Sequence, residues 1–149
     1  MGCKAVFVAA TRQHVGKTST CLGMVSGLTK RFGRVGFIKP VGQEHVKAEN
    51  VRVDKDVKLV REYFGLSHCR LEQMSPVVIP AGYTRKYLDK VDGFSDADQL
   101  FKINSSFAAI SDSSDFVVVE GTGHVGVGAI CNVSNAQVAA MLGVRTSRH

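Results

Sequence analysis

Residues 5–18 read A-V-F-V-A-A-T-R-Q-H-V-G-K-T, and this stretch predicts a strand, a loop and the start of a helix. It opens with a continuous apolar run, as in a strand that is buried on both faces of a parallel sheet. The polar residues that follow end in Gly16-Lys17-Thr18. From there to Phe32, apolar residues recur at three- and four-residue spacing, which predicts an amphipathic helix with Gly33 as its C-terminal cap.

The loop between this strand and this helix fits a phosphate-binding motif. In the pattern G-x-x-x-x-G-K-[ST], backbone N–H groups and the helix N-terminus converge on phosphate oxygens. Gly16-Lys17-Thr18 satisfies the end of the pattern, whereas Thr11 stands at its first glycine position. We assign Lys17 to the terminal phosphates and the Thr18 hydroxyl to Mg²⁺, with a chance G-K-T at a helix start as the alternative. The predicted contacts to ATP or GTP are Thr11, Arg12, Gln13, His14, Val15, Gly16, Lys17, Thr18 and Ser19.

Strands and helices continue to alternate after this first unit. A second strand is predicted over residues 34–39, ended by Pro40, which cannot donate to a β-ladder. A second helix is predicted over residues 54–64, with Gly65 as its stop signal. The irregular residues 71–93 are predicted to be mostly loop.

The C-terminal half follows the same alternation. A capping box at Ser95 predicts the start of a third amphipathic helix. A buried strand over residues 116–119 leads to Glu120, and a second capping box at Ser134 begins a short helix that ends near Leu142.

This alternation predicts an α/β fold, a doubly wound and mainly parallel sheet of the P-loop NTPase type, in one domain over residues 1–149. Only three strands are clearly indicated, fewer than such sheets usually have. The chain stops at residues 144–149, where the alternation calls for another strand. We therefore expect the domain to be incomplete at its C-terminus.

Composition narrows the function classes. The chain has 149 residues, 44% of them hydrophobic, and a formal net charge of +6. The positive charge would suit a polyanion, but no nucleic-acid motif accompanies it, so we expect no nucleic-acid partner. No apolar run could cross a bilayer and no signal peptide precedes the first strand, which predicts a soluble cytoplasmic protein without a membrane partner, with an organelle left open. The cysteines and histidines lack metal-site spacing, and we expect buried reduced thiols and loop or surface imidazoles.

Three segments together carry a family resemblance. Residues 10–18 read A-T-R-Q-H-V-G-K-T, residues 36–42 read G-F-I-K-P-V-G and residues 117–123 read V-V-V-E-G-T-G. In this order they resemble dethiobiotin synthetase and its relatives, which include cobyrinic acid diamide synthetase-like proteins and the N-terminal regions of some phosphotransacetylases. The resemblance implies an ATP- and Mg²⁺-binding domain of a ligase family that acts in biotin biosynthesis. That family activates a carboxylate or carbamate by phosphoryl transfer and then closes an amide-type bond.

The resemblance also implies roles for individual residues. Lys17 and Lys39 are the implied catalytic lysines, and Thr18, Asp56 and Glu120 the implied Mg²⁺ ligands. Asp54 is the alternative to Asp56, because D-K-D offers two registers. Oxygen ligands from separate loops suit an octahedral Mg²⁺.

The sequence departs from the family at the substrate side. Gln43 stands where the family has a substrate-contacting serine, which leaves open which small carboxylate or amine is the substrate. A nucleotide-sensing module without turnover, or an inactive fragment, are the alternatives to a ligase. Arg12 stands where related dimeric ATPases carry a lysine that reaches a partner's phosphates, so a homodimer is also open.

Overall fold

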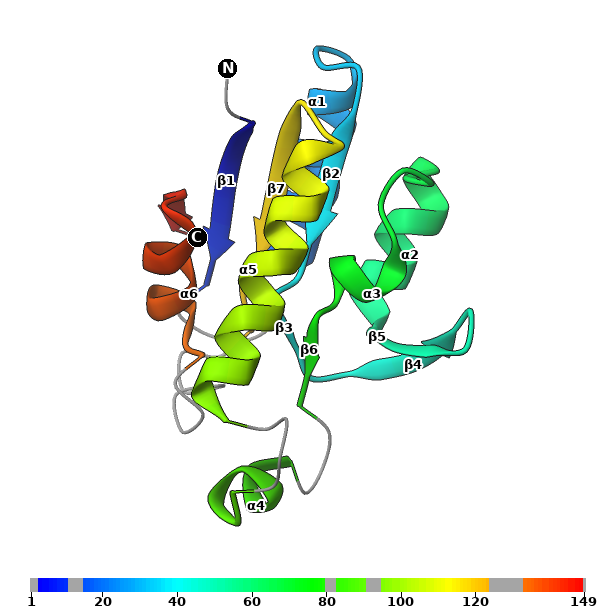
Figure 1. Cartoon of the computed structure of the whole chain (residues 1–149). Helices are drawn as coiled ribbons and strands as arrows, with labels where there is room; N and C mark the ends of the chain where they lie inside the picture. The colour runs from blue at the N-terminus through cyan, green and yellow to red at the C-terminus, as the bar shows by residue number, and fades with distance from the viewer. Residues whose placement is uncertain (1–2, 11–14, 80–82, 91–94, 124–132, 149) are drawn as a thin grey trace.

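The computed structural model describes residues 3–10, 15–79, 83–90, 95–123 and 133–148. Its main sheet has four parallel strands in the order β2-β7-β1-β8 (Figure 1). Their bounds are β1 Lys4–Ala9, β2 Val35–Ile38, β7 Phe116–Glu120 and β8 Arg145–Arg148. The predicted parallel α/β sheet is confirmed. Strand β8 lies where the alternation called for another strand, so the main sheet has one more described strand than the three predicted.

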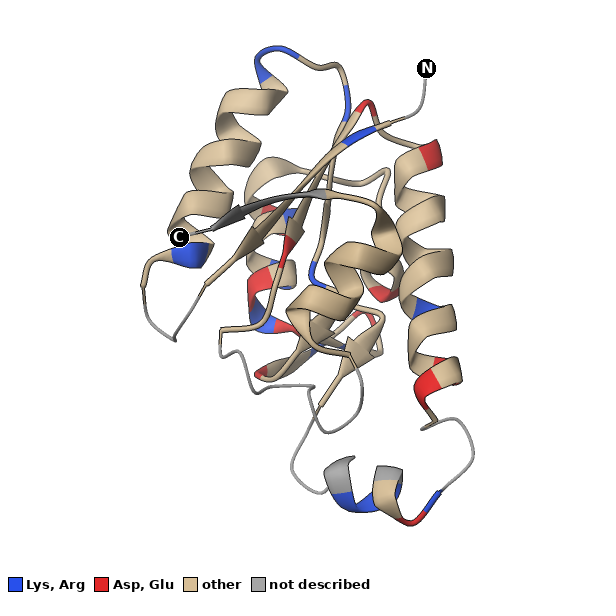
Figure 2. Cartoon of the chain, turned by 90° about the vertical axis from the view of Figure 1, so that its left-hand side faces the viewer, with Lys and Arg blue, Asp and Glu red and all other residues tan. Residues whose placement is uncertain are grey.

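Helices cover both faces of this sheet. Helix α1 (Lys17–Thr29) lies on one face and α5 (Asp96–Asp112) on the other, as Figure 2 shows with the sheet seen between them. Helix α6 (Asn135–Leu142) contacts α5, and α2 (Lys55–Phe64) contacts both α1 and β2. The predicted doubly wound architecture is therefore confirmed.

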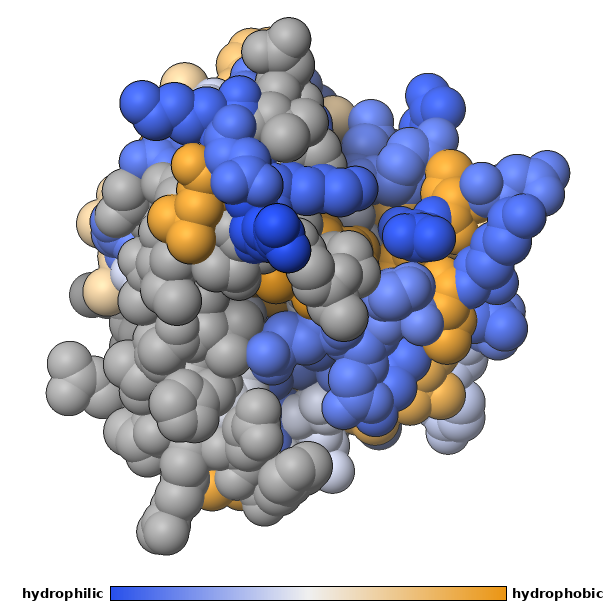
Figure 3. All heavy atoms as spheres, turned by 90° about the horizontal axis from the view of Figure 1, so that it is seen from below, coloured by the Kyte–Doolittle hydropathy of each residue, from blue (hydrophilic) through white to orange (hydrophobic). Residues whose placement is uncertain are grey.

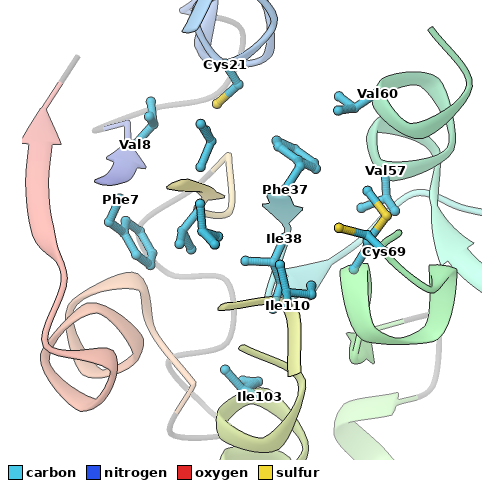
Figure 4. Close-up of a cluster of buried hydrophobic side chains, with 14 of the residues drawn as sticks. Phe7, Val8, Cys21, Phe37, Ile38, Val57, Val60, Cys69, Ile103 and Ile110 are labelled. Carbon is cyan, nitrogen blue, oxygen red and sulfur yellow. The ribbon is translucent and has the colours of Figure 1, made fainter. Parts of the chain in front are cut away.

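The core lies where the strands are covered on both sides. Every residue of β2 is buried, and Val117 to Val119 of β7 have no exposed surface. Because both faces are covered, these strands are continuous apolar runs rather than alternating ones. The side chains that meet in Figure 4 include Phe7, Val8, Cys21, Phe37, Ile38, Val57, Val60, Cys69, Ile103 and Ile110.

Most of the predicted helix ends are confirmed. Ser95 and Ser134 form capping boxes with Asp98 and Gln137, and Gly65 and Gly143 end their helices in the left-handed conformation. These signals are local, so the sequence displays them directly.

Two predictions about the chain's local structure were wrong. Helix α1 ends at Thr29 with Lys30 as its right-handed cap, so Gly33 is not the cap. The described part of residues 71–93 is not mostly loop, because it contains three short elements: α3 Leu71–Met74, β6 Val77–Val78 and α4 Tyr83–Leu88; residues 80–82 and 91–93 lie outside the described residues. Elements this short show no periodicity. Strand β6 exists because it pairs with β3 (Val41–Gly42), a contact made by distant segments.

A β-hairpin follows β3 and was not predicted. Strands β4 (His45–Ala48) and β5 (Val51–Asp54) form a separate antiparallel sheet, which extends beside α2 in Figure 1. Its two turn residues, Glu49 and Asn50, have φ of 48° and 66°. Both central residues of such a turn need positive φ, and the usual Asn-Gly or Asp-Gly signal is absent here.

Candidate functional site

The functional side chains gather at the carboxyl ends of β1 and β7. Strand β1 leads to α1 on one face of the sheet, whereas α6, the helix that follows β7, lies against α5 on the other. Neighbouring strands whose helices go to opposite faces leave a crevice between them, and open α/β sheets bind ligands there. Val8 and Glu120 are opposite each other in this strand pair, so Glu120 stands at the crevice.

The first turn of α1 is prepared for a negative ligand. Gly16 precedes it with φ of 84°, a left-handed conformation that residues with a Cβ rarely adopt. Among the described residues no side chain caps this turn, and no acidic residue lies in it. Its N–H groups, together with the positive end of the helix dipole, therefore point at a site that an anion can occupy.

Lys17 and Thr18 converge on one buried carboxylate. Lys17 Nζ donates to Glu120 Oε1 at 2.6 Å, and Thr18 Oγ1 donates to the same oxygen at 3.0 Å. Glu120 is fully buried, and its other oxygen, Oε2, has no hydrogen-bond partner among the residues that the structure describes. A buried carboxylate oxygen without a partner is unfavourable unless a ligand or ion completes its contacts.

Lys39 joins this group from the end of β2. Its Nζ donates to Asp54 Oδ1 at 2.9 Å and to Asp56 Oδ2 at 2.6 Å, and lies 3.8 Å from Glu120 Oε1. Burial lowers the pKa of Lys39, but the charges of Glu120 and Asp54 and the hydrogen bond to Asp56 outweigh it, so the net pKa is raised. Lys39 therefore stays charged. The buried cluster balances three carboxylates against the ammonium groups of Lys17 and Lys39, which leaves a negative excess that suits a cation.

The two candidate aspartates have different surroundings. Asp54 caps α2: Oδ1 accepts the Asp56 N–H at 2.9 Å and Oδ2 accepts the Gln43 N–H at 3.1 Å. A Cβ on Gly42 would lie 2.6 Å from Asp54 Oδ2, so the glycine lets β3 approach this carboxylate. Asp56, by contrast, places Oδ2 3.4 Å from Thr18 Oγ1. Asp54 is thus occupied by backbone N–H groups, whereas Asp56 faces the hydroxyl at the start of α1.

All of these groups except Glu120 line a polar cavity of about 410 Å³, within the range of about 300–1,000 Å³ for small-molecule sites. It lies at the carboxyl edge of the sheet, the end of the molecule that faces the viewer in Figure 3. Its lining residues are Val15, Gly16, Lys17, Thr18, Ser19, Lys39, Gln43, Glu44, Asp54, Lys55, Asp56 and Gly123.

Asn135, which the sequence did not single out, holds the segment that follows Glu120. Its Oδ1 accepts the Thr122 N–H at 2.8 Å, and its Nδ2 donates to the Thr122 carbonyl at 3.2 Å. A Cβ on Gly121 would meet Asn135 Oδ1 at 2.7 Å and the Phe7 ring at 2.8 Å. The first residue of α6 therefore helps to position Glu120. Asparagine in a helix first turn is ordinary, so no sequence signal marked it.

The structure brings together both predicted catalytic lysines, all three predicted Mg²⁺ ligands and the predicted contacts Val15, Gly16 and Ser19. Thr11, Arg12, Gln13 and His14 lie outside the described residues. Within the described ranges, no group of three or more His, Cys, Asp or Glu side chains has a metal-binding arrangement. Any Mg²⁺ site here therefore needs the Thr18 hydroxyl and further oxygens beside its two carboxylates.

The remaining predictions concern thiols and membranes. Cys21 and Cys69 are buried free thiols, as expected, and Cys3 is partly exposed. None of the helices in the described ranges has the length and apolar character needed to cross a bilayer.

Several known proteins are similar in sequence to most of this chain. Residues 4–146 match the protein family described as AAA domain. The phosphate acetyltransferase of Nitratidesulfovibrio vulgaris is 28% identical over 93% of this chain and 18% of its own length. That of Nitrosomonas europaea is 32% identical over 77% of the chain and 15% of its own length. The ATP-dependent dethiobiotin synthetase BioD of Caldicellulosiruptor bescii is 25% identical over 83% of the chain and 50% of its own length.

These matches confirm the family resemblance that the three motifs indicated. The chain spans about half the length of the synthetase relative and less than a fifth of each acetyltransferase.

Proposed function

This chain belongs to the AAA domain family, and from that premise we propose that it binds ATP together with Mg²⁺ at the start of α1. A P-loop domain implies nucleotide binding; the choice of ATP follows the name of the ATP-dependent synthetase relative. The observation that carries the proposal is the convergence of Lys17 and Thr18 on Glu120, in front of a helix start that has no cap of its own.

The chain's own residues would act mainly by positioning and charge neutralisation. The uncapped N–H groups of α1 would hold phosphate oxygens. Lys17 would exchange Glu120 for the terminal phosphates, a short movement of one ammonium group. Lys39, charged and held by Asp54 and Asp56, would face the phosphates beside Lys17, since both ammonium groups lie within 4 Å of Glu120 Oε1.

For Mg²⁺ we propose Thr18, Asp56 and Glu120 as the protein ligands, with water and phosphate oxygens completing the site. The unpartnered Oε2 of buried Glu120 fits a hard cation, as do the hydroxyl and carboxylate donors around it. Asp56 is preferred to Asp54 because the latter's oxygens already accept backbone N–H groups. The bound ion would supply charge neutralisation for the phosphates.

Two functions are proposed for the bound nucleotide, one with a reaction and one without. The synthetase relative supports an ATP-dependent ligase that activates a small carboxylate or carbamate. The acetyltransferase relatives support a nucleotide-sensing domain without turnover. Gln43, which lines the cavity in place of the family's serine, favours a substrate other than diaminopelargonate or the sensing role.

Calorimetry with ATP and Mg²⁺ tests nucleotide binding. Lys17→Ala removes a charge-assisted phosphate contact and should weaken binding by about tenfold to a hundredfold. Lys30→Ala is the matched control, because Lys30 lies at the other end of α1, about 20 Å away for a helix of this length. Equal affinity of Lys17→Ala and wild type would refute the proposal.

Mg²⁺ titrations test the metal ligands. Glu120→Gln and Asp56→Asn should each reduce the Mg²⁺ dependence of ATP binding more than metal-free binding. Asp54→Asn should instead lower stability, because the amide has no charge to pair with Lys39 and only one oxygen for the two backbone N–H groups that Asp54 accepts. If Asp54→Asn shifts the Mg²⁺ titration and Asp56→Asn does not, the Mg²⁺ ligand is Asp54 rather than Asp56.

Product analysis and sedimentation test the finer functions. Diaminopelargonate, bicarbonate, ATP and Mg²⁺ should yield no dethiobiotin by mass spectrometry; robust turnover would overturn the substrate assignment.

Arg12→Ala should reduce any ATP-dependent dimerisation without changing the affinity of the monomer for ATP. If sedimentation shows wild-type monomer at every nucleotide concentration, the homodimer is excluded.

A further inference from the structure

Two exposed cations face each other on the β4–β5 hairpin. Lys47 and Arg52 are directly opposite in its register, and both are exposed. Side chains at opposite positions of an antiparallel pair lie about 4.5–5.5 Å apart at Cβ, and like charges there are destabilising. The tight turn at Glu49 and Asn50 fixes this register, so the two charges cannot slide apart.

Neither cation has a partner among the described residues. The neighbouring cations all do: Lys55 pairs with Glu44, Lys58 with Glu62 and Arg61 with Glu49. No ion pair or side-chain hydrogen bond joins Lys47 or Arg52 to any part of the chain that the structure describes. The acidic side chains of residues 44–55 are thus engaged elsewhere, and this pair keeps its charge free.

The hairpin face that carries the pair leads into the nucleotide cavity. Arg52 and Asp54 are two residues apart on β5, so their side chains lie on the same face, about 7 Å apart along the strand. Asp54 lines the cavity, as do Gln43 and Glu44 just before β4. Val53, on the opposite face, is fully buried, whereas Arg52 is exposed, two residues before Asp54, which lines the cavity. In Figure 3, hydrophilic residues gather over the side of the molecule where the hairpin lies.

We propose that Lys47 and Arg52 bind an anionic group of the second substrate, a small molecule with an anionic group at each end. One end would lie in the cavity beside Lys39, and the other would accept hydrogen bonds from the hairpin pair. An aliphatic dicarboxylate is the simplest compound of this class. This rests on the proposed function for the place of the reacting end, but the contact of the hairpin with an anion does not depend on ATP.

The experiment compares a hairpin variant with a charge-matched control. Lys47→Gln with Arg52→Gln removes two exposed cations near the cavity. Lys30→Gln with Arg31→Gln removes two exposed cations beyond the far end of α1. Malonate, glutarate, pimelate and inorganic phosphate are titrated into each protein by calorimetry at low salt, with and without Mg²⁺ and a non-hydrolysable ATP analogue.

Wild type should bind glutarate or pimelate more tightly than malonate or phosphate, because only the longer chains can extend from the cavity lining at Asp54 to Arg52, which is two residues or about 7 Å along β5. The hairpin variant should lose about tenfold to a hundredfold of that affinity, and the control variant should match wild type. The hairpin variant should also melt no lower than wild type, because it loses a repulsive pair.

Several results would overturn the proposal: equal dicarboxylate affinity in wild type and hairpin variant, no binding of any probe to wild type, or a lower melting temperature of the hairpin variant. Binding of a DNA duplex that depends on the pair, without dicarboxylate binding, would assign the surface to a polyanion instead. Titration of the ATP analogue alone separates the two proposals. Its failure in wild type refutes the nucleotide site, while the nucleotide-free dicarboxylate titration still decides the hairpin's role.

Discussion

The helices α1 and α5 begin in opposite ways. Helix α5 has a full capping box at Ser95 and acidic residues in its first turn, so its own side chains satisfy its N–H groups. Helix α1 begins at a left-handed glycine with neither feature, and Lys17 and Thr18 follow at once. A cap contributes about 1 kcal/mol of stability. Helix α1 lacks that contribution, but its first N–H groups remain available to an anion. The comparison therefore distinguishes a helix start suited to ligand binding from one that serves stability alone.

The largest expected effect is a loss of stability at the start of α2. This helix start has a side-chain cap, like α5, and also lies at the cavity, like α1. It is capped by Asp54, as α5 is by Ser95, yet this cap is held by Lys39 in the cavity. Lys39→Ala removes a buried cation and should lower the free energy of unfolding by about 3–5 kcal/mol, because Asp54 loses its charge partner. Urea unfolding followed by circular dichroism measures it. The exposed pair Lys55–Glu44 supplies the control, and Lys55→Ala should change stability little; similar losses in both variants would contradict the role given to Lys39.

A pair of glycines separates conformation from binding. Gly16 before α1 and Gly143 after α6 both have positive φ, and a Cβ at either would meet nothing within 4 Å. Alanine at either should lower the free energy of unfolding by about 1–2 kcal/mol through backbone strain alone. Only Gly16→Ala should also weaken ATP binding, because it shifts the N–H groups that face phosphate. Calorimetry on both variants checks this, and equal affinity losses would remove the distinction.

Substitutions in the capping boxes should lower stability without changing ATP affinity. Ser95→Ala and Ser134→Ala should each lower the free energy of unfolding by about 1 kcal/mol, or roughly 2–4 °C in melting temperature. ATP affinity should stay at the wild-type value, since neither serine lines the cavity. Differential scanning calorimetry and ATP titration of the same samples provide both readings. A drop in affinity without a drop in melting temperature would reverse the assignment of these helix starts.

The smallest expected effect is a pH dependence of stability that comes from His68, which does not line the cavity. Burial, and then the charge of Arg34, lower the pKa of His68. The unfolded chain then takes up a proton at higher pH than the folded one, so stability is full above about pH 6.5 and falls as the pH drops below it. His68→Gln should flatten the melting temperature between pH 5 and 8 without affecting ATP affinity. Parallel pH profiles for variant and wild type would show that His68 makes no such contribution.

The order of elements around the cavity could be predicted because its signals are short in sequence. The apolar run before the loop, the G-K-T end of the motif and the capping box at Ser95 each lie within a few residues. The family motifs placed Lys39 and Glu120 at strand ends, and the structure shows them there. The hairpin, α3 and β6 were missed because each is short and depends on contacts with distant segments.

The contacts between the predicted site residues belong to the tertiary structure. Lys17 and Glu120 are 103 residues apart in the chain, so no local pattern could reveal their 2.6 Å hydrogen bond. The choice between Asp54 and Asp56 was also open in sequence, because both lie at the same helix start. Only the folded chain shows that backbone N–H groups already bind Asp54 while Asp56 faces Thr18.

The sequence by itself therefore determined the fold class, the phosphate loop and the residues from which a site could be built. It did so because backbone conformation and burial are encoded over a few residues at a time. Only the folded chain shows which carboxylate each lysine contacts. Only the folded chain shows which oxygen of Glu120, and which hairpin cations, have no partner within the described ranges. Those properties depend on distances between segments that the sheet brings together, and such distances are set only when the strands pair and the helices close over both of its faces.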